Sequence, residues 1–456
     1  MASAPKKLLG SFALTMISVS AVLSLRNFPM MATLGLPMIG FYILAALCFL
    51  IPSALVCAEL ATTFPKSGGI YTWVKAAFGD RYGFLAIWME WINNVVAFPT
   101  TLATIVATLA YLGIPTLQQN HWLLFALMML IYWVLTAFNC LGIKPSSRLT
   151  IVGGLLGTIA PCVLIIALFI AMIFLGHHVN TNLFQQSPLP PWHFTSLVFF
   201  VGVLSSFSGM QVTAFHAQNV KNPRRDFPRS IFLATIIILL ASTLGSLAIA
   251  LMLPSQKIHL ANGVIQAMSL MFAKLGITNI IPWIALLIAL GLVASLNAWV
   301  ISPARGLHKA TQEGYLGKSL AKLNKHAMPS NILWLQALIV TALSLLFVLM
   351  PNFKDAFWML VAITSQFTVL MYIFVFASAI RLRFKTASLP AHYKIPGGII
   401  GVSIVGLVGI IACAIGFLLG LLPPAQLHIT GFWHYVLMIL AGDAIILIAP
   451  FLFKRR

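Results

Sequence analysis

Charged residues are scarce in this 456-residue chain, and a few of them lie inside long apolar runs. Only 7 residues are Asp or Glu, against 27 Lys and Arg, and charged residues make up 7% of the sequence. Arg26, Glu90 and Asp443 each stand within an apolar stretch. An ionisable group at membrane depth is costly and usually functional, for example in binding a charged substrate or relaying a proton. The sequence therefore directs attention to charge recognition inside a membrane.

Patterns for covalent or metal chemistry are missing from the sequence. There is no H-E-x-x-H motif and no comparable acid and base pair within one apolar run. The five cysteines all fall in apolar runs, and none is spaced from His or another Cys as a metal site requires. We expect them to be packing residues. The sequence thus predicts no enzyme activity, no metal and no cofactor.

Two of the apolar runs contain clusters of small polar residues at mid-length. The first holds Ser18, Ser20 and Ser24, and the second holds Ser205, Ser206, Phe207, Ser208 and Gly209. Such clusters favour an unwound helix, and unwound backbone at membrane depth must line a cavity or be buried in protein. Its free amide and carbonyl groups can bind a zwitterion. The alternative is that small residues simply let helices pack closely.

Arg26 follows the first of these clusters. A buried guanidinium needs an anion, and a substrate carboxylate and Glu90 are both candidates. A third interpretation is an Arg whose side chain reaches the outer interface. The sequence leaves these three alternatives open.

These residues must be positioned by membrane-spanning helices. Hydrophobic residues make up 61% of the chain, and a helix needs roughly 20 apolar residues to span a bilayer. Nearly continuous apolarity also excludes a transmembrane barrel, whose strands alternate. We predict an all-α integral membrane protein with about twelve spans, at 8–32, 36–62, 82–112, 122–143, 149–176, 195–218, 229–253, 280–305, 331–350, 355–382, 398–421 and 432–453. Breaks in the first and sixth spans indicate two five-span repeats of inverted topology, 8–176 and 195–382, with two peripheral helices at 398–453.

The basic residues are distributed asymmetrically over the predicted loops. If the chain starts inside and crosses at every span, all Lys and Arg lie on the cytoplasmic side except Arg26, Lys257, Lys274 and Lys354. This is the positive-inside pattern, and it predicts that both termini are cytoplasmic. The net charge of +20 is therefore explained by the membrane, and no nucleic-acid partner is expected.

Four stretches give the chain a resemblance to a known family. They are AELATTFPKSGGIYTWV at 58–74, KNPRRDFP at 221–228, SFSGMQVTAFH at 206–216 and WVISPARG at 299–306. The first two resemble signatures of the amino acid–polyamine–organocation (APC) transporters. The last two are closer to the glutamate/GABA antiporter branch. The resemblance covers nearly the whole chain, and it implies the same fold of five-plus-five inverted repeats with two extra helices.

The resemblance also implies roles for single residues. Asn94 resembles a substrate-contacting position and Trp299 a cavity-lining aromatic, while an interhelical hydrogen bond and lipid packing are the respective alternatives. Gln211 stands where many relatives carry Glu, and Ser295 replaces an acidic residue of at least one relative. His216 matches a His of the branch, although a lone His is more often a packing residue.

Gln has no titratable group, so we do not expect proton coupling through position 211. The residues that we expect to act in coupling or gating are Glu59, Glu90, Gln211, His216 and Ser295. For Glu59 we expect a gate or a structural pair, and for Asp443 a dimer contact or a local pair.

The predicted function is secondary active transport of amino acids by alternating access, with a glutamate/GABA-like antiporter as one form. Proton- or sodium-coupled symport of a neutral amino acid or polyamine is the alternative. A non-transporting sensor or a channel is the alternative from another class. We expect an amino acid substrate, a multi-pass location in the plasma or inner membrane, and either a monomer or a homodimer.

Overall fold

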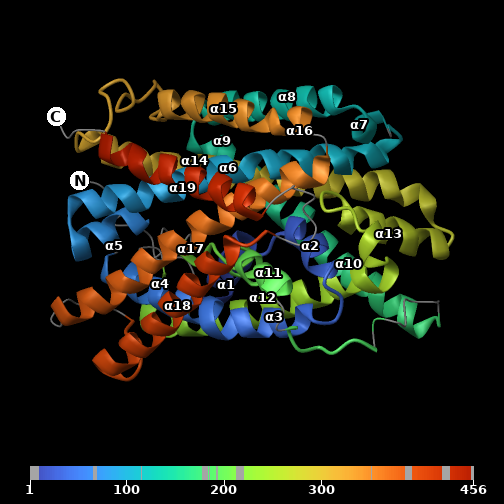
Figure 1. Ribbon diagram of the computed structural model, residues 1–456, viewed down its shortest axis with the longest axis horizontal. Coiled ribbons are helices and arrows are strands. Elements are labelled where there is room, and N and C mark those ends of the chain that lie inside the picture. The colour runs from blue at the N-terminus through green and yellow to red at the C-terminus, as the bar shows by residue number, and fades with distance from the viewer. Residues whose placement is uncertain are drawn as a thin grey trace.

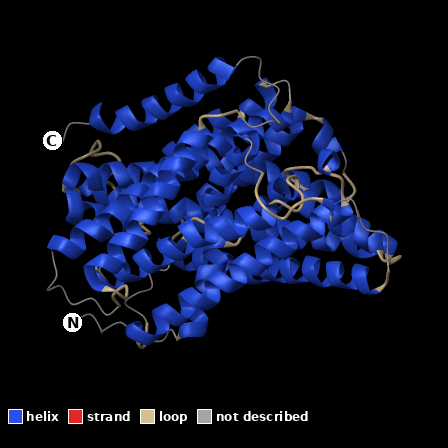
Figure 2. Ribbon diagram, turned by 60° about the horizontal axis from the view of Figure 1, so that its bottom comes forward, coloured by secondary structure: helices blue, strands red, loops and turns tan. Residues whose placement is uncertain are grey.

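The computed structural model describes residues 10–64, 69–114, 116–176, 183, 185–191, 194–211, 220–350, 352–385, 393–423 and 432–452. Within these residues the protein is all-helical and contains no strand (Figure 2). Nine helices are long and apolar enough to cross a membrane, and a bent pair of shorter helices forms one more candidate span. The predicted class of an all-α membrane protein is confirmed.

Each predicted span contains a helix of the described chain. The first half of the chain holds α1 (Ser11–Val22), η1 (Leu25–Asn27), α2 (Phe28–Ala32), α3 (Met38–Ala45), η2 (Ala46–Leu50), α4 (Ile51–Thr63), α5 (Gly69–Phe78), α6 (Asp80–Leu109), α7 (Thr116–Gln119), α8 (His121–Asn139), α9 (Ile143–Gly154), η4 (Leu155–Ile159) and α10 (Ala160–Phe174). The second half holds α11 (Phe194–Ser206), α12 (Pro223–Met252), α13 (Gly263–Lys274), α14 (Ile281–Gln312), α15 (Ser330–Ser344), α16 (Leu346–Leu349), α17 (Phe353–Lys385), α18 (Gly398–Gly420) and α19 (Phe432–Leu452).

The first span is interrupted after Val22. Leu23 and Ser24 adopt extended backbone conformations, and the chain then resumes as η1 and α2. The two halves are bent by 42° relative to each other. The Leu23 amide still donates to the carbonyl of Val19 at 2.8 Å, and the Ser24 carbonyl accepts from the amide of Asn27 at 3.1 Å. Within the described residues, the Leu23 carbonyl and the Ser24 amide are the backbone groups left to face a ligand. The interruption predicted for this span is confirmed.

The sixth span is interrupted after Ser206, where α11 ends. Gly209 has a φ of +125°, and a Cβ atom there would lie 2.8 Å from the carbonyl oxygen of Ala21. The two interruptions therefore pack against each other, and the absence of a side chain at Gly209 allows the close approach. The later part of this predicted span, 212–218, lies outside the described residues.

The long helices α6, α12, α14 and α17 surround these interruptions (Figure 1). α6 packs against both α14 and α17, and α1 packs against α12. The last helix, α19, runs along the edge of the molecule next to the C label in Figure 2, where Trp88 of α6 donates to the carbonyl of Ile446 at 3.0 Å. The two-repeat organisation itself stays a prediction.

Small residues bring α14 against the α9–η4 segment. A Cβ atom on Gly157 would lie 2.2 Å from the Cα atom of Gly291, and one on Gly291 would lie 2.1 Å from the backbone of Gly157. Membrane helices associate through such close backbone contacts because lipid supplies no hydrophobic drive between them. This contact fixes the helix that carries Ser295 and Trp299.

We expect Gly157→Ala to destabilise the protein by about 1–3 kcal/mol, because the added methyl group must push two backbones apart. The matched control is Gly154→Ala, three residues earlier at the end of α9, where nothing lies within 4 Å of the added atom. That control should be neutral or slightly stabilising, since Ala favours a helix over Gly by roughly 1 kcal/mol. The measurement is the melting temperature of each purified variant in detergent, and equal melting temperatures would contradict the contact.

Candidate functional site: a cavity between two interrupted helices

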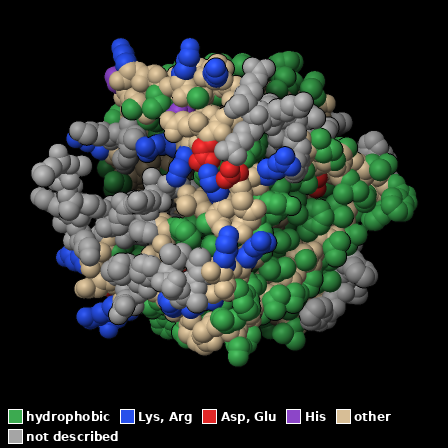
Figure 3. All heavy atoms as spheres, turned by 90° about the vertical axis from the view of Figure 1, so that its left-hand side faces the viewer, with side chains coloured by type: hydrophobic (Ala, Val, Ile, Leu, Met, Phe, Trp, Pro, Cys, Tyr) green, Lys and Arg blue, Asp and Glu red, His purple; other side chains and the backbone are tan. Residues whose placement is uncertain are grey.

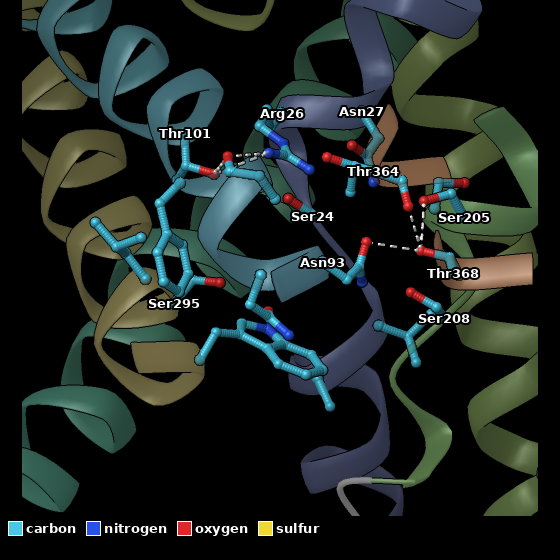
Figure 4. Close-up of a pocket in the computed structure, with 18 of the residues that line it drawn as sticks. Ser24, Arg26, Asn27, Asn93, Thr101, Ser205, Ser208, Ser295, Thr364 and Thr368 are labelled. Atoms are coloured by element: carbon cyan, nitrogen blue, oxygen red, sulfur yellow. Dashed lines mark hydrogen bonds between the residues drawn. The ribbon is translucent and has the colours of Figure 1, made fainter. Parts of the chain in front are cut away.

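A cavity lies where the interruptions of the first and sixth spans meet α6, α14 and α17 (Figure 4). Figure 4 shows Asn93, Ser205, Ser208 and Thr364 around one central space, with Arg26 at its edge. The predicted site residues that line this cavity are Ser24, Arg26, Glu90, Asn94, Ser205, Ser206, Ser208, Gln211, Ser295 and Trp299. These residues are far apart in the sequence, so the fold brings together most of the predicted site.

Arg26 is held at the edge of the cavity by neutral partners. Its Nη1 atom donates to the hydroxyl oxygens of Thr100 and Thr101, both at 2.8 Å, and to the carbonyl oxygen of Ala97 at 3.2 Å. All three acceptors belong to α6. Among the described residues none of the ion pairs includes Arg26. The guanidinium therefore enters the cavity with its positive charge uncompensated by a protein carboxylate.

Arg26 also borders a second, smaller cavity. The two cavities share Arg26, Asn27, Ser205, Ser206 and Thr364. The second one continues past Arg26 towards a set of mainly apolar side chains, which includes Met30, Phe357 and Val361. In the predicted topology this direction leads to the outer side of the membrane. Arg26 thus lies between the two chambers and faces both.

Glu90 has a different partner from the one that its charge suggests. The side chain is 6% exposed, and its Oε1 atom accepts a long hydrogen bond of 3.5 Å from Nε2 of Gln211. The interpretation in which Glu90 neutralises Arg26 is not realised in this structure. The reason lies along α6: the Arg26 contacts at Ala97 and Thr101 lie seven and eleven residues after Glu90, which is roughly 10 and 16 Å along the helix axis.

Gln211 links Glu90 to the interruption of the sixth span. Its Oε1 atom accepts from the amide of Gly209 at 3.1 Å and from the hydroxyl of Tyr372. The same Gly209 amide also donates to the Tyr372 hydroxyl oxygen at 3.1 Å. Because both functional groups of the Gln211 amide are used, the side chain has a fixed orientation with its NH₂ group towards Glu90.

Several lining residues were missed by the sequence reasoning. Thr368 of α17 donates to Oδ1 of Asn93 at 3.3 Å and lies 3.3 Å from the Ser205 hydroxyl. Thr364 and Thr368 are four residues apart on one face of α17, and Thr101 and Asn27 complete the polar lining. Threonine is common in membrane helices, so its presence in the sequence did not indicate a cavity-lining position. The four-residue spacing on a helix could have pointed to a shared face.

Other predicted residues lie outside the cavity lining. Ser18 is inside α1 and donates to the carbonyl of Leu14 at 2.9 Å, and Ser20 is exposed. Phe207 is buried and packs against the ring of Tyr42 at 5.6 Å between ring centroids. Gly209 contacts Ala21 behind the cavity, as described above. His216 lies outside the described residues.

Asn94 lines the cavity at 9% exposure, but its Nδ2 atom already donates to the carbonyl of Glu90 at 2.8 Å. Its Oδ1 atom and the second hydrogen on Nδ2 are left for other partners. Asp443 of α19 is 3% exposed and stands outside the cavity. Neither of its carboxylate oxygens has a hydrogen-bond partner within the described part of the chain.

Glu59 belongs to a polar cluster at one end of the bundle. It forms an ion pair with Arg383 of α17 at 2.6 Å and accepts from the amide of Ile395 at 2.7 Å. This ion pair links the ends of α4 and α17. These are ends that the charge pattern assigns to the cytoplasmic side. The role of a gate or a structural pair for Glu59 stays a prediction.

A second ionic contact lies at the same end, where α5 meets the end of α14. Lys75 pairs with Glu313 and with Asp80, the latter at 3.2 Å, and Tyr71 donates to Glu313. The hydrogen bond to Glu313 raises the pKa of Lys75, although burial opposes the shift. Burial alone would raise the pKa of Glu313, but the hydrogen bonds from Lys75 and Tyr71 lower it.

Figure 3 looks onto the end of the molecule that carries α5. Lys and Arg side chains are spread over this face, around a small acidic group near its centre. This gathering agrees with the asymmetry read from the sequence, and the side of the membrane on which it lies stays a prediction.

Comparison with known proteins places this architecture in a family. A family model described as amino acid permease matches residues 9–442. The chain is 39% identical over 452 residues to an uncharacterized transporter of Legionella pneumophila. The aligned region covers 99% of this chain and 97% of that relative. It is 28% identical to a glutamate/gamma-aminobutyrate antiporter of Lactococcus lactis over 98% of this chain and 89% of that protein.

A probable agmatine/putrescine antiporter of Lactococcus lactis is 25% identical, over 80% of this chain and 78% of its own length. The family match and the full-length relatives agree with the many spanning helices and with the central cavity. The chain is a multi-pass membrane transporter that belongs to the amino acid permease family.

Proposed function

We propose that this transporter exchanges amino acids across the membrane by alternating access, and that its substrates include one with an anionic side chain, such as glutamate. The observation that carries the proposal is Arg26, whose guanidinium borders the cavity with only neutral hydrogen-bond partners. A desolvated cation without a counter-charge favours an anionic ligand, and Arg suits a carboxylate because its planar fork can donate two parallel hydrogen bonds.

The interruptions of the first and sixth spans supply sites for the rest of the substrate. Leu23 and Ser24 are extended, and Ser205, Ser206 and Ser208 line the cavity at the end of α11. We propose that the substrate's α-carboxylate and ammonium bind at these interruptions, where amide and carbonyl groups are freed from the helical ladder. Trp299 and Asn94 would shape the pocket around the substrate side chain.

The relatives support exchange as the mode of transport. The glutamate/gamma-aminobutyrate antiporter covers almost the whole of this chain, including both interruptions. We further propose that the spans form two inverted repeats, 8–176 and 195–382, that move against each other, with both termini cytoplasmic. The ion pairs of Glu59 with Arg383 and of Lys75 with Glu313 would hold the cytoplasmic end closed in one state and break in the other.

The test is a substrate screen in proteoliposomes with purified protein. Vesicles are loaded with unlabelled glutamate, GABA, glutamine or agmatine, and the uptake of each labelled compound is measured. Exchange predicts rapid glutamate uptake only into vesicles that hold a substrate. Uptake into empty vesicles under a proton or sodium gradient would instead identify a symporter. If no amino acid moves under any gradient, the transporter proposal fails, and a non-transporting sensor becomes the better interpretation.

A further inference from the structure

The cavity holds two groups of opposite charge that do not pair with each other. Arg26 lies at the edge that faces the second chamber, and Glu90 lies at the interruption of the sixth span. Glu90 and the α6 residues that Arg26 contacts, Ala97 to Thr101, are separated by roughly 10–16 Å along the helix axis. Any substrate in the cavity occupies the space between them and experiences both charges.

Glu90 has the surroundings of a group that can gain and lose a proton. Within the described residues, its carboxylate accepts a side-chain hydrogen bond of 3.5 Å from the neutral amide of Gln211, and none of the ion pairs includes it. It also lines the cavity, which gives a proton access from the cavity water. Asp443, another carboxylate within the predicted spans, is buried and does not line the cavity.

In the part of the chain that the structure describes, few other titratable groups lie near Glu90. Cys57 of α4 and Tyr372 of α17 lie within electrostatic range of it, and Arg26 shares its cavity. The residues that α14 contributes to the lining, Leu292, Ser295, Leu296 and Trp299, carry no titratable group. In water a thiol titrates near about pH 8.5 and a phenol near about pH 10. Of this set, Glu90 is the group that carries a carboxylate, whose negative charge a bound proton would neutralise.

We propose that Glu90 is a proton-binding site coupled to the anionic substrate: a proton bound by its carboxylate makes the cavity net positive and favours the binding of a substrate anion at Arg26. This inference rests on the proposed function. With Glu90 ionised, its charge and that of Arg26 balance, and an anionic substrate adds an excess negative charge. With Glu90 protonated, Arg26 and the substrate anion balance. Linkage requires that the bound anion in turn strengthens proton binding at Glu90.

The size of the coupling follows from the distance. Two unit charges separated by roughly 10–16 Å in a medium of effective dielectric constant about 20 change each other's binding by roughly 5- to 15-fold. We therefore expect the KM for glutamate to rise by about tenfold as the pH is raised from about 5 to about 7.5, over a range in which free glutamate keeps its charge. A substrate without net charge, such as glutamine, should show a far smaller change.

The experiment measures glutamate and glutamine exchange at equal pH on both sides of the proteoliposome membrane. For Glu90→Gln we expect a glutamate KM that no longer depends on pH, because the neutral amide fixes the cavity charge. With glutamine inside the vesicles and glutamate outside, a pH-sensitive dye in the lumen should report proton entry with glutamate in the wild type and none in this variant. The matched control is Asp443→Asn, which also removes a membrane-buried carboxylate and should keep the wild-type pH dependence.

Two further variants protect the test against a folding defect in Glu90→Gln. Glu90→Asp keeps the carboxylate and should keep a pH-dependent KM. Gln211→Met removes the hydrogen bond to Glu90 and should move the midpoint of the pH dependence. If Glu90→Gln keeps the wild-type pH dependence, or if wild-type glutamate exchange shows none, the inference is overturned while the proposed function stands. If the wild type exchanges no anionic amino acid, both fail.

Discussion

Arg26→Gln is expected to weaken the apparent affinity for glutamate by about 30- to 150-fold and to leave that for neutral amino acids within about threefold. The structural basis is the guanidinium at the cavity edge, which donates to Ala97, Thr100 and Thr101 and has no carboxylate partner among the described residues. A hydrogen bond between charged groups contributes about 2–3 kcal/mol, and each 1.4 kcal/mol is a factor of ten in affinity. Exchange kinetics in proteoliposomes measure both KM values.

Two control variants separate charge recognition from structural support. Arg26→Lys keeps a positive charge but loses the planar fork, so it should recover part of the glutamate affinity and leave the preference for anions in place. Thr101→Val removes one of the hydroxyl acceptors that hold Arg26 and should affect anionic and neutral substrates by similar factors. Equal losses for both substrate classes in Arg26→Gln would contradict substrate recognition and make Arg26 a structural link between the first span and α6.

Gly209→Val is expected to abolish transport while the protein still inserts into the membrane. Gly209 has a φ of +125°, a backbone conformation that L side chains rarely adopt, and a Cβ atom added there would lie only 2.8 Å from the carbonyl oxygen of Ala21. The amide of Gly209 also donates to Gln211 and Tyr372, so a shift of the backbone would disturb the group that faces Glu90. Strained backbone of this kind costs of order 1–3 kcal/mol before any clash is counted.

Gly113 provides the matched control for this prediction. It also has a positive φ, of +95°, but nothing lies within 4 Å of an added Cβ atom. Gly113→Ala therefore carries the backbone strain without the contact, and it should lower the melting temperature slightly with transport retained. Gly209→Ala should lose most of the transport rate through the contact with Ala21. Similar activity in the two Ala variants would show that the close packing of the interruptions is unimportant.

Part of this site was predictable because sequence position limits depth in the membrane. Ser24, Arg26 and Ser205 stand at mid-length in their apolar runs, and they line the cavity. Ser18 and Ser20 belong to the same cluster, but they precede the interruption and stay within α1. The sequence places the cluster without locating the residue at which the helix ends, because one Ser has nearly the same helical preference as the next.

The partners of the charged residues were not predictable in the same way. Glu90 and Arg26 have opposite charges and suggest an ion pair, yet Glu90 faces Gln211 and Arg26 faces three neutral acceptors of α6. Likewise, the role of Thr368 depends on Asn93 and Ser205, which lie on two other helices. These contacts join residues between 71 and 275 positions apart, and they depend on helix rotation and packing.

The sequence by itself determined that this protein spans a membrane, where its helices lie, where two of them are interrupted and which few charges are inside. Those properties follow from the free energy of transferring each residue into lipid, which depends on residue type. The tertiary structure alone decided that Arg26 is not paired with a carboxylate in the described part of the chain, that Glu90 accepts from Gln211, and that the two interruptions contact each other at Gly209. Hydropathy sets how deep a residue lies in the bilayer, whereas the choice of partner at that depth is set by how the helices pack.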